Sequence, residues 1–404
     1  MSGYSSILAA GSSLRSEHNG PRGIIYLAWH GKALDRIDVR SAIQSSWRDC
    51  AEQAIAEQMH GALRGASSIW MRDDLYITLP IIGSDDLGVE EQLLELGCRL
   101  QQEWEERFFF AALGGSGELL DLRLHAGISI VGNNGDTGQV GDLWYEGMKR
   151  AIVHGQSVCA VQRSLQRKAL EGMIRGRLIT PVYQPIISLN NGAVYGYEAL
   201  SRCPENRWFQ GPEQLFSFAS DEGMVYALDR LARERAIECS AGLSSQQKLF
   251  INITAQIMND PFFTPGQTLL LLERYGLSPT NVVFEITERS SIEDFGAAKR
   301  TLGHYRNQGY QIAIDDAGAG YSSLQSIVEL EPDYIKIDRS LIRDIHRDGM
   351  KEHIVHTFID LAAKMGVSLV AEGIETEAEL LHMEAMGVHY AQGYFLGKPM
   401  LAVV

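Results

Sequence analysis

The clearest pattern in the chain is a series of short apolar runs, each followed by polar residues and a longer amphipathic stretch. In residues 311–323, the apolar run 312–314 stops at two adjacent aspartates, Asp315 and Asp316, and a loop rich in glycine follows. An uninterrupted apolar run is typical of a strand buried on both faces. Successive strand residues point to opposite faces, so both carboxylates reach one site only if the backbone turns there.

Similar runs recur between residues 180 and 395 at spacings of roughly 20 to 36 residues, with helical patterns between them. Alternating strands and helices favour a parallel sheet with right-handed crossovers. Seven or eight such units predict closure into an eight-stranded TIM-like (β/α)8 barrel, in which functional groups gather at the carboxyl ends of the strands. The polar residues at or near the ends of these runs are Glu198, Asn252, Glu285, Glu288, Asp315, Lys336, Glu372 and Gln392.

The first part of the chain has a different order of elements and predicts a smaller α/β domain over residues 23–163. We expect a strand at 24–28, a helix at 38–63, a hairpin at 67–80, a helix at 89–106, a strand at 122–131 and a helix at 140–154. Residues 1–22, rich in Ser and Gly, predict a flexible segment. Residues 164–175 predict a connecting helix that leads into a barrel domain of residues 166–404.

Composition limits the function classes. The 404 residues are 45% apolar, which is ample for two or three buried cores, and the net charge of −15 argues against a general DNA-binding protein. The five cysteines are an odd total without close pairs, which predicts free thiols in a reducing compartment. No apolar run approaches the roughly 18 residues of a membrane span. We therefore expect a cytoplasmic protein with no membrane span.

Two charged residues lie inside otherwise apolar strands. Glu285 is flanked by Phe and Ile, and Lys336 by two isoleucines. A buried charge needs a partner or a metal ion. Each residue alone is also compatible with a structural ion pair, as Asn252 is with a turn and Asp316 with a helix cap. Several acidic or amide residues at successive strand ends favour a metal site, and oxygen ligands without Cys or His favour Mg²⁺ or Mn²⁺ over zinc.

A set of short motifs occurs in order along the second part of the chain. The motifs are Glu198-Ala199-Leu200 with Arg202, Asn252, Glu285-x-Thr287-Glu288, Asp315-Asp316, Lys336-x-Asp338, Glu372-Gly373-Ile374-Glu375 and Gln392-Gly393. Together they resemble the EAL-domain phosphodiesterases, which hydrolyse the bacterial second messenger cyclic di-GMP to linear pGpG. The resemblance covers about residues 166–400, and Ala317 stands where the family commonly has Phe.

The resemblance implies a role for each site residue. Two cations, Mg²⁺ or Mn²⁺, assist the attack of water on a phosphodiester, and Ca²⁺ is expected to be inhibitory. Lys336 orients the water or accepts its proton, with Glu372 and Gln392 assisting, and Glu288 positions the loop 317–323. Leu200, Arg202 and Gln184 bind substrate, although Arg202 is also compatible with an exposed ion pair. The first cation is held by Glu198, Asn252, Glu285 and Asp315, and the second by Asp315, Asp316 and Glu372.

Residues 23–163 are similar in pattern to a GGDEF domain, the diguanylate cyclase module often found before EAL domains. The family's Arg-x-Gly-Gly-Asp-Glu-Phe motif is replaced by residues 70–76, Trp-Met-Arg-Asp-Asp-Leu-Tyr, which lack the glycines that let backbone approach a phosphate. The metal-binding aspartate of the first strand and the inhibitory Arg-x-x-Asp site are also missing. The resemblance therefore implies a degenerate, noncatalytic regulatory or dimerisation domain, and we expect a homodimer.

Two other functions remain open from the sequence. One is a catalytically silent receptor for cyclic di-GMP, and the complete set of metal and lysine positions favours the phosphodiesterase over it. The other is a different metal-dependent barrel enzyme, such as an enolase-like proton abstractor. The paired aspartates followed by Gly-Ala-Gly-Tyr-Ser-Ser, together with the Glu-Ala-Leu-x-Arg segment, argue against that enzyme.

Overall fold

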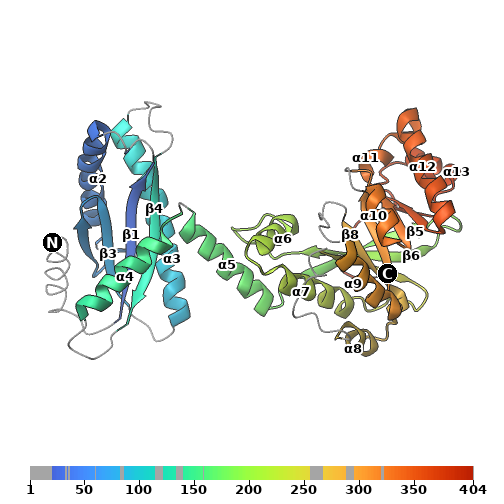
Figure 1. Cartoon of the computed structure of the whole chain (residues 1–404), viewed down its shortest axis with the longest axis horizontal. Helices are drawn as coiled ribbons and strands as arrows, with labels where there is room; N and C mark the ends of the chain where they lie inside the picture. Colours follow the sequence, from blue (N-terminus) through green and yellow to red (C-terminus); the bar gives the residue numbers. More distant parts are fainter. Residues whose placement is uncertain are drawn as a thin grey trace. The chain divides into compact units, whose positions relative to one another are not determined.

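In the computed structural model, the chain forms two compact units, Met1–Ala169 and Leu170–Val404 (Figure 1). Helix α5 (Ala160–Arg175) carries the chain from the first unit into the second, and it begins four residues before the predicted start at 164. The structure describes residues 21–31, 34, 37–59, 61–81, 86–113, 122–132, 140–157, 159–254, 267–287, 295–319 and 323–403.

The first unit is an antiparallel four-stranded sheet in the order β2-β3-β1-β4. Along the chain the elements are a strand, a helix, a hairpin, a helix and a strand, and this order is typical of a split βαβ arrangement. Most of the predicted flexible segment 1–22 lies outside the described residues, but Arg22 is buried in the first strand. The elements are β1 (Arg22–His30), α2 (Ile37–Gln58), β2 (Ser67–Met71), β3 (Asp74–Pro80), α3 (Asp86–Leu113), β4 (Arg123–Val131) and α4 (Val140–His154).

Both faces of β1 are covered, because alternate residues point to opposite layers. Tyr26 packs on the α4 side in a cluster with Met148. Trp29 lies on the other face, where its ring contacts Trp47 of α2 and Phe108 of α3 at centroid distances of 5.7 and 4.6 Å. The unit is therefore a sheet between one helix and two helices, which explains the nearly uninterrupted apolar pattern of its first strand.

The second unit contains a closed barrel of eight strands, as the sequence predicts. Going round the barrel, the strands follow the order β10-β11-β12-β5-β6-β7-β8-β9. Their bounds are β5 (Thr180–Ser188), β6 (Val194–Arg202), β7 (Lys248–Ile253), β8 (Val282–Thr287), β9 (Gln311–Ala317), β10 (Tyr334–Ile337), β11 (Ser368–Ala371) and β12 (Tyr390–Gln392).

The expectation of an all-parallel sheet is wrong for β5, which runs antiparallel to both β6 and β12. The chain turns from β5 into β6 within a few residues, where Ser188 N–H donates to Ala193 O at 2.9 Å and Gly192 has φ +68°. Parallel neighbours need a crossover of a dozen or more residues. A connection this short can only join antiparallel strands, and the other neighbouring pairs in the barrel are parallel.

The barrel interior has an apolar layer below a polar layer. Residues two apart on a strand share a face, so Phe250, Val283, Ala313, Tyr334 and Val370, which form one buried interior cluster, lie one step below the polar residues. The polar residues that follow them by two positions are Asn252, Glu285, Asp315, Lys336 and Glu372. The polar layer therefore occupies the carboxyl end of the barrel.

Helices cover the outside of the barrel over a large apolar core that includes Ile335 and Ile337 on either side of Lys336. In the described part of the chain, no helix combines the length and apolarity that crossing a membrane requires. The helices are α6 (Pro212–Asp221), α7 (Val225–Glu238), α8 (Gln267–Arg274), η4 (Pro279–Asn281), α9 (Phe295–Asn307), α10 (Ser323–Leu330), α11 (Arg339–Ile342), η5 (Ile345–Arg347), α12 (Gly349–Met365) and α13 (Glu377–Met386).

Candidate active site

Lys336 lies at the centre of a cluster of carboxylates. Its side chain is fully buried, and its Nζ contacts Glu285 Oε1 and Glu372 Oε1 at 2.7 Å each. Asp315 Oδ1 lies 3.1 Å and Glu198 Oε2 3.2 Å from the same nitrogen. Strands β6, β8 and β9 and the residue after β11 thus deliver four carboxylates to one ammonium group, which leaves an excess of three negative charges when all of them are ionised.

Glu198 is held in place by two amides as well as by the lysine. Gln392 Nε2 donates to Glu198 Oε2 at 2.7 Å, and Asn252 Nδ2 donates to Glu198 Oε1 at 3.0 Å. Gln392 Nε2 also donates to Gln184 Oε1 at 3.1 Å, and Gln184 in turn donates to Gly397 O. Both oxygens of Glu198 therefore have fixed directions, and Gln184 belongs to this interior network.

The paired aspartates reach the same region because the backbone turns between them. Asp316 has φ +57°, a left-handed conformation that is uncommon for a residue other than glycine. Asp315, Asp316 and Glu372 each offer a carboxylate oxygen, and these oxygens all lie within 4.8 Å of one another. Both aspartates lie inside β9, where the pairing with β10 shifts register between Ile335 and Ile337, so the change of backbone direction is an irregularity within the strand.

Burial and mutual repulsion set the protonation of this cluster. Burial raises the pKa of Glu285 and Glu372 well above the usual value, and the pKa of Asp315 is raised for the same reason, with the neighbouring carboxylates adding to the effect. Burial opposes the charged forms of Glu198 and Lys336 too. Lys336 and the two amides nevertheless lower the pKa of Glu198, and the four carboxylates raise the pKa of Lys336 well above its ordinary value.

The donor set fits hard divalent cations. All the converging side chains offer oxygen except the lysine, and such sets favour Mg²⁺ or Mn²⁺. Glu285 Oε2 is buried and accepts no hydrogen bond from the described residues. A buried carboxylate oxygen in that position is costly unless a cation or proton compensates it. One ammonium group cannot neutralise four carboxylates, so the cluster has capacity for further positive charge.

The comparisons with known proteins agree with this geometry. The EAL domain profile matches residues 166–399. The chain belongs to the EAL domain family. Probable cyclic di-GMP phosphodiesterase PdeB of Escherichia coli is 30% identical over 259 residues, which are 62% of this chain and 49% of the relative. Cyclic di-GMP phosphodiesterase NbdA of Pseudomonas aeruginosa is 27% identical over 341 residues, 78% of this chain and 42% of the relative.

Among solved structures, the PaMucR phosphodiesterase in complex with c-di-GMP is similar to this chain with a TM-score of 0.51 and 28% identity. The similarity covers 58% of this chain and 97% of that one. This chain spans about half the length, or less, of the curated relatives that it matches.

A cavity of about 420 Å³ opens beside the EAL motif and reaches Asn252 of the site. Leu200 and Arg202, predicted to bind substrate, both line it together with residues of α6 and α7. Arg202 is exposed, and its Nη1 donates to Ser201 O at 2.9 Å. Within the described part of the chain it forms no ion pair with a carboxylate, so the ion-pair alternative for this residue gains no support.

Gly393 brings two segments of the EAL barrel close together. A Cβ at this position would lie 2.1 to 2.6 Å from backbone atoms of Ile374, so only glycine fits. Ile374 N–H donates to Gln392 O at 3.0 Å across the same contact. The Gln-Gly pair at the end of β12 therefore fixes the loop that begins at Glu372.

Two points separate the sequence prediction from the observed site. Glu288, the predicted loop-positioning residue, lies outside the described residues. Asp229 of α7 was not predicted: it is buried, and its Oδ2 accepts a hydrogen bond from Thr254 N–H at 2.9 Å, two residues after Asn252. The sequence feature that could have pointed to Asp229 is its place on an apolar helix face next to Leu228, with Arg233 four positions later as a possible ion-pair partner.

Proposed function

We propose that the EAL barrel of this chain hydrolyses cyclic di-GMP to linear pGpG. The observation that carries the proposal is the convergence of Glu198, Glu285, Asp315 and Glu372 on Lys336, at the carboxyl end of the barrel. The names of the relatives and the complex of PaMucR with c-di-GMP support the choice of substrate. The metal ligands remain as proposed from the sequence, with Asn252 and Asp316 completing the set.

The chain's own residues would bind and orient the substrate and a water molecule. Bound Mg²⁺ or Mn²⁺ would supply Lewis-acid stabilisation of the phosphodiester and of the attacking water. Gln392 and Asn252 fix the direction of the Glu198 oxygens. Lys336 offers N–H donors where the water attacks phosphorus, and Arg202 offers an exposed guanidinium to a phosphate. One P–O3′ bond breaks, and the ribose 3′ oxygen leaves with a proton derived from the water.

Turnover by the purified full-length chain tests this proposal. Incubation with cyclic di-GMP and Mg²⁺ is expected to give pGpG, and chelation of the metal with EDTA is expected to stop the reaction. Tight binding of cyclic di-GMP without any product in Mg²⁺ or Mn²⁺ would instead identify a receptor.

Calcium is expected to support binding of cyclic di-GMP but not its hydrolysis. Ca²⁺ has longer ligand distances and a looser coordination geometry than Mg²⁺, so it would hold the substrate and water in a poorer arrangement. The measurement is the rate of pGpG formation in Mg²⁺, Mn²⁺ and Ca²⁺, together with the affinity for cyclic di-GMP in Ca²⁺. Equal rates in Mg²⁺ and Ca²⁺ would contradict the proposed metal site.

The first unit, in our proposal, is a degenerate GGDEF-like domain without cyclase activity. Its split βαβ sheet supports this assignment. We expect no cyclic di-GMP to form from GTP and Mg²⁺, because residues 70–76 lack the glycines of the cyclase motif. Detectable synthesis by the Lys336→Met variant, which is expected to degrade its product slowly, would contradict the prediction.

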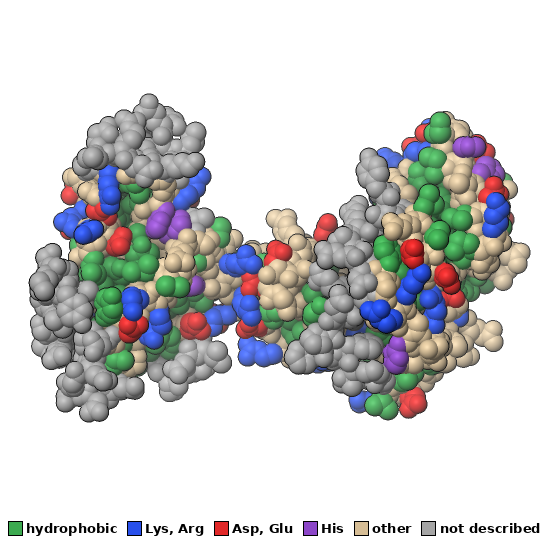
Figure 2. Space-filling view, viewed as in Figure 1, with side chains coloured by type: hydrophobic (Ala, Val, Ile, Leu, Met, Phe, Trp, Pro, Cys, Tyr) green, Lys and Arg blue, Asp and Glu red, His purple; other side chains and the backbone are tan. Residues whose placement is uncertain are grey.

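We further propose that the protein is a cytoplasmic homodimer. The five cysteines form no disulfide, which suits a reducing compartment. Exposed apolar side chains gather over α10 and α12 (Figure 2), helices that follow the neighbouring strands β9 and β10. Leu324 and Val328 are 58% and 59% exposed, and Met350 is 69% exposed. Such a surface is typical of an interface.

The dimer is tested by sedimentation of the wild-type chain and of a Leu324→Glu/Val328→Glu double variant at micromolar concentration. We expect a dimer for the wild type and a monomer for the variant, because two carboxylates would be desolvated at the interface. A wild-type protein that sediments only as a monomer contradicts the assignment.

A further inference from the structure

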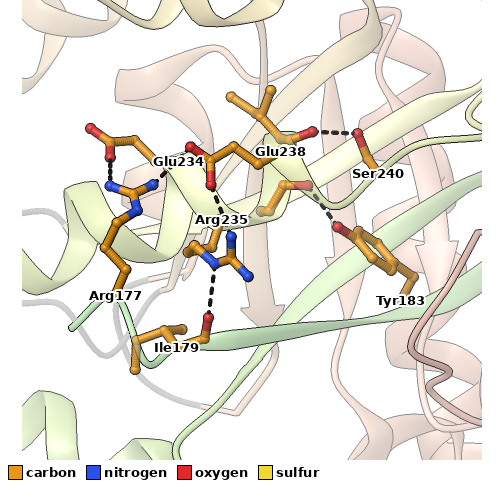
Figure 3. A network of polar contacts seen from close by, with 9 residues as sticks. Arg177, Ile179, Tyr183, Glu234, Arg235, Glu238 and Ser240 are labelled. Carbon is orange, nitrogen blue, oxygen red and sulfur yellow. Dashed lines mark hydrogen bonds and ion pairs between the residues drawn. The ribbon is translucent and has the colours of Figure 1, made fainter. Parts of the chain in front are cut away.

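The residues directly after α5 are held to α7 by ion pairs. Arg177 Nη1 lies 2.7 Å from Glu234 Oε2, and Arg177 Nη2 lies 2.8 Å from Glu238 Oε1 (Figure 3). The partners are separated by 57 and 61 residues in the sequence. The guanidinium group of Arg177 thus bridges two glutamates that are one helical turn apart on α7.

Arg177 holds a backbone position that usually belongs to glycine. Helix α5 ends with Leu178 N–H donating to Met173 O and Arg177 N–H donating to Ile174 O. This pair of bonds closes a helix with a left-handed residue, most often Gly, at the position of Arg177. Arg177 has φ +53° there. An arginine side chain at a position that favours glycine indicates that its contacts with α7 compensate for the unfavourable backbone conformation.

Further bonds tie the start of β5 to the same helix. Arg235 of α7 donates from Nε to Ile179 O at 3.2 Å, and its Nη1 contacts Glu238 Oε2 at 3.0 Å. Tyr183 donates from its hydroxyl to Ala236 O at 2.7 Å (Figure 3). Glu238 is therefore shared by two arginines, and the segment that leaves α5 is held along α7 at three points.

Another part of α7 holds the strand that carries a site residue. Asp229 is 2% exposed, and its Oδ2 accepts the amide N–H of Thr254 at 2.9 Å. Thr254 follows β7, two residues after Asn252, whose amide orients Glu198. Ala232 of α7 and Asn252 also line the same cavity. A shift of α7 would therefore move the end of β7 and the wall of this cavity together.

We propose that Arg177 is a positioning residue for the metal site. The ion pairs of Arg177 with Glu234 and Glu238, called the clamp below, set the position of α7. Asp229 of α7 in turn fixes the end of β7 and hence the position of Asn252. Because α5 is the covalent connection between the two units, these ion pairs lie directly after the segment that links the first unit to the barrel. The kinetic consequence rests on the proposed phosphodiesterase function, whereas the structural coupling does not.

The test compares Arg177→Gly and Arg230→Ala in the full-length chain. Glycine suits the left-handed backbone and removes only the clamp. Arg230 is an exposed arginine of α7 that pairs with Glu234 at 3.9 Å within the helix, so it controls for lost charge. We expect amide hydrogen exchange at Thr254, measured without substrate, to become at least fivefold faster in Arg177→Gly and to stay unchanged in Arg230→Ala.

A second readout is the Mg²⁺ concentration required for half-maximal hydrolysis, which we expect to rise severalfold in Arg177→Gly and to recover in part in Arg177→Lys. Unchanged exchange at Thr254 overturns the proposal, and so does a uniform increase in exchange across the barrel, which indicates general destabilisation. If the wild type fails to hydrolyse cyclic di-GMP while exchange at Thr254 responds as expected, the proposed function fails and the clamp stands.

Discussion

Lys336→Met is expected to lower turnover of cyclic di-GMP by about 10²- to 10⁴-fold, the usual contribution of a group that orients or transfers a proton in the transition state. Methionine retains much of the side-chain volume but removes the ammonium group that contacts four carboxylates. The affinity for cyclic di-GMP is expected to change much less, because Leu200 and Arg202, the residues proposed to bind substrate, line the cavity beside the site and are unchanged in this variant. The measurement is kcat and KM, with substrate binding in Ca²⁺ as an independent check.

The same variant is expected to depend on metal for its stability. Removing one partner of a buried ion pair typically costs about 3–5 kcal/mol, and here the remaining carboxylates would repel one another. Melting temperatures are expected to fall without metal and to recover in Mg²⁺. Lys299→Met is the matched control, because Lys299 is exposed and pairs with Glu329 on the surface. Normal turnover in Lys336→Met would remove this residue from the reaction, and unfolding even in Mg²⁺ would make it a structural residue only.

Glu198→Gln and Asp315→Asn are each expected to abolish measurable turnover, a loss of at least about 10³-fold, because each removes a charged oxygen from the proposed set of metal ligands. The substitutions keep side-chain size, so the barrel is expected to remain folded. Binding of Mg²⁺, followed by calorimetry or by its effect on melting temperature, is expected to weaken in parallel with activity.

The control for these ligand variants is Glu375→Gln. Glu375 lies three residues after Glu372 but is exposed and pairs with Arg339 at 2.6 Å. We expect this variant to bind Mg²⁺ and turn over cyclic di-GMP as the wild type does. Equal Mg²⁺ binding by Glu198→Gln and the wild type would contradict the assignment of the ligands.

The polar layer of the barrel could be predicted from the sequence because side chains along a strand alternate between its two faces with a period of two residues. Lys336 alternates with Ile335 and Ile337, which pack outward, so its side chain had to point inward. The direction of β5 could not be predicted in this way. Its apolar pattern suits a parallel or an antiparallel strand equally, and only the short turn at Gly192 decides between them.

Contacts between distant segments left little signal in the sequence. Arg177 forms ion pairs with Glu234 and Glu238. In the sequence, these charged residues look like ordinary solvent-exposed residues. Asp229 and Thr254 meet through a single side-chain bond to a backbone amide, which no spacing rule predicts. These contacts depend on how α7 packs on the barrel, and that packing is a property of the folded chain.

Hydrolysis in water enriched in ¹⁸O tests the central claim most directly. The purified chain, with cyclic di-GMP and Mg²⁺, is expected to yield pGpG in which one oxygen of the new terminal phosphate carries the label, as mass spectrometry of the product will show. Intact cyclic di-GMP after prolonged incubation, or a product whose phosphate lacks the label, would contradict a phosphodiesterase that directs water to phosphorus.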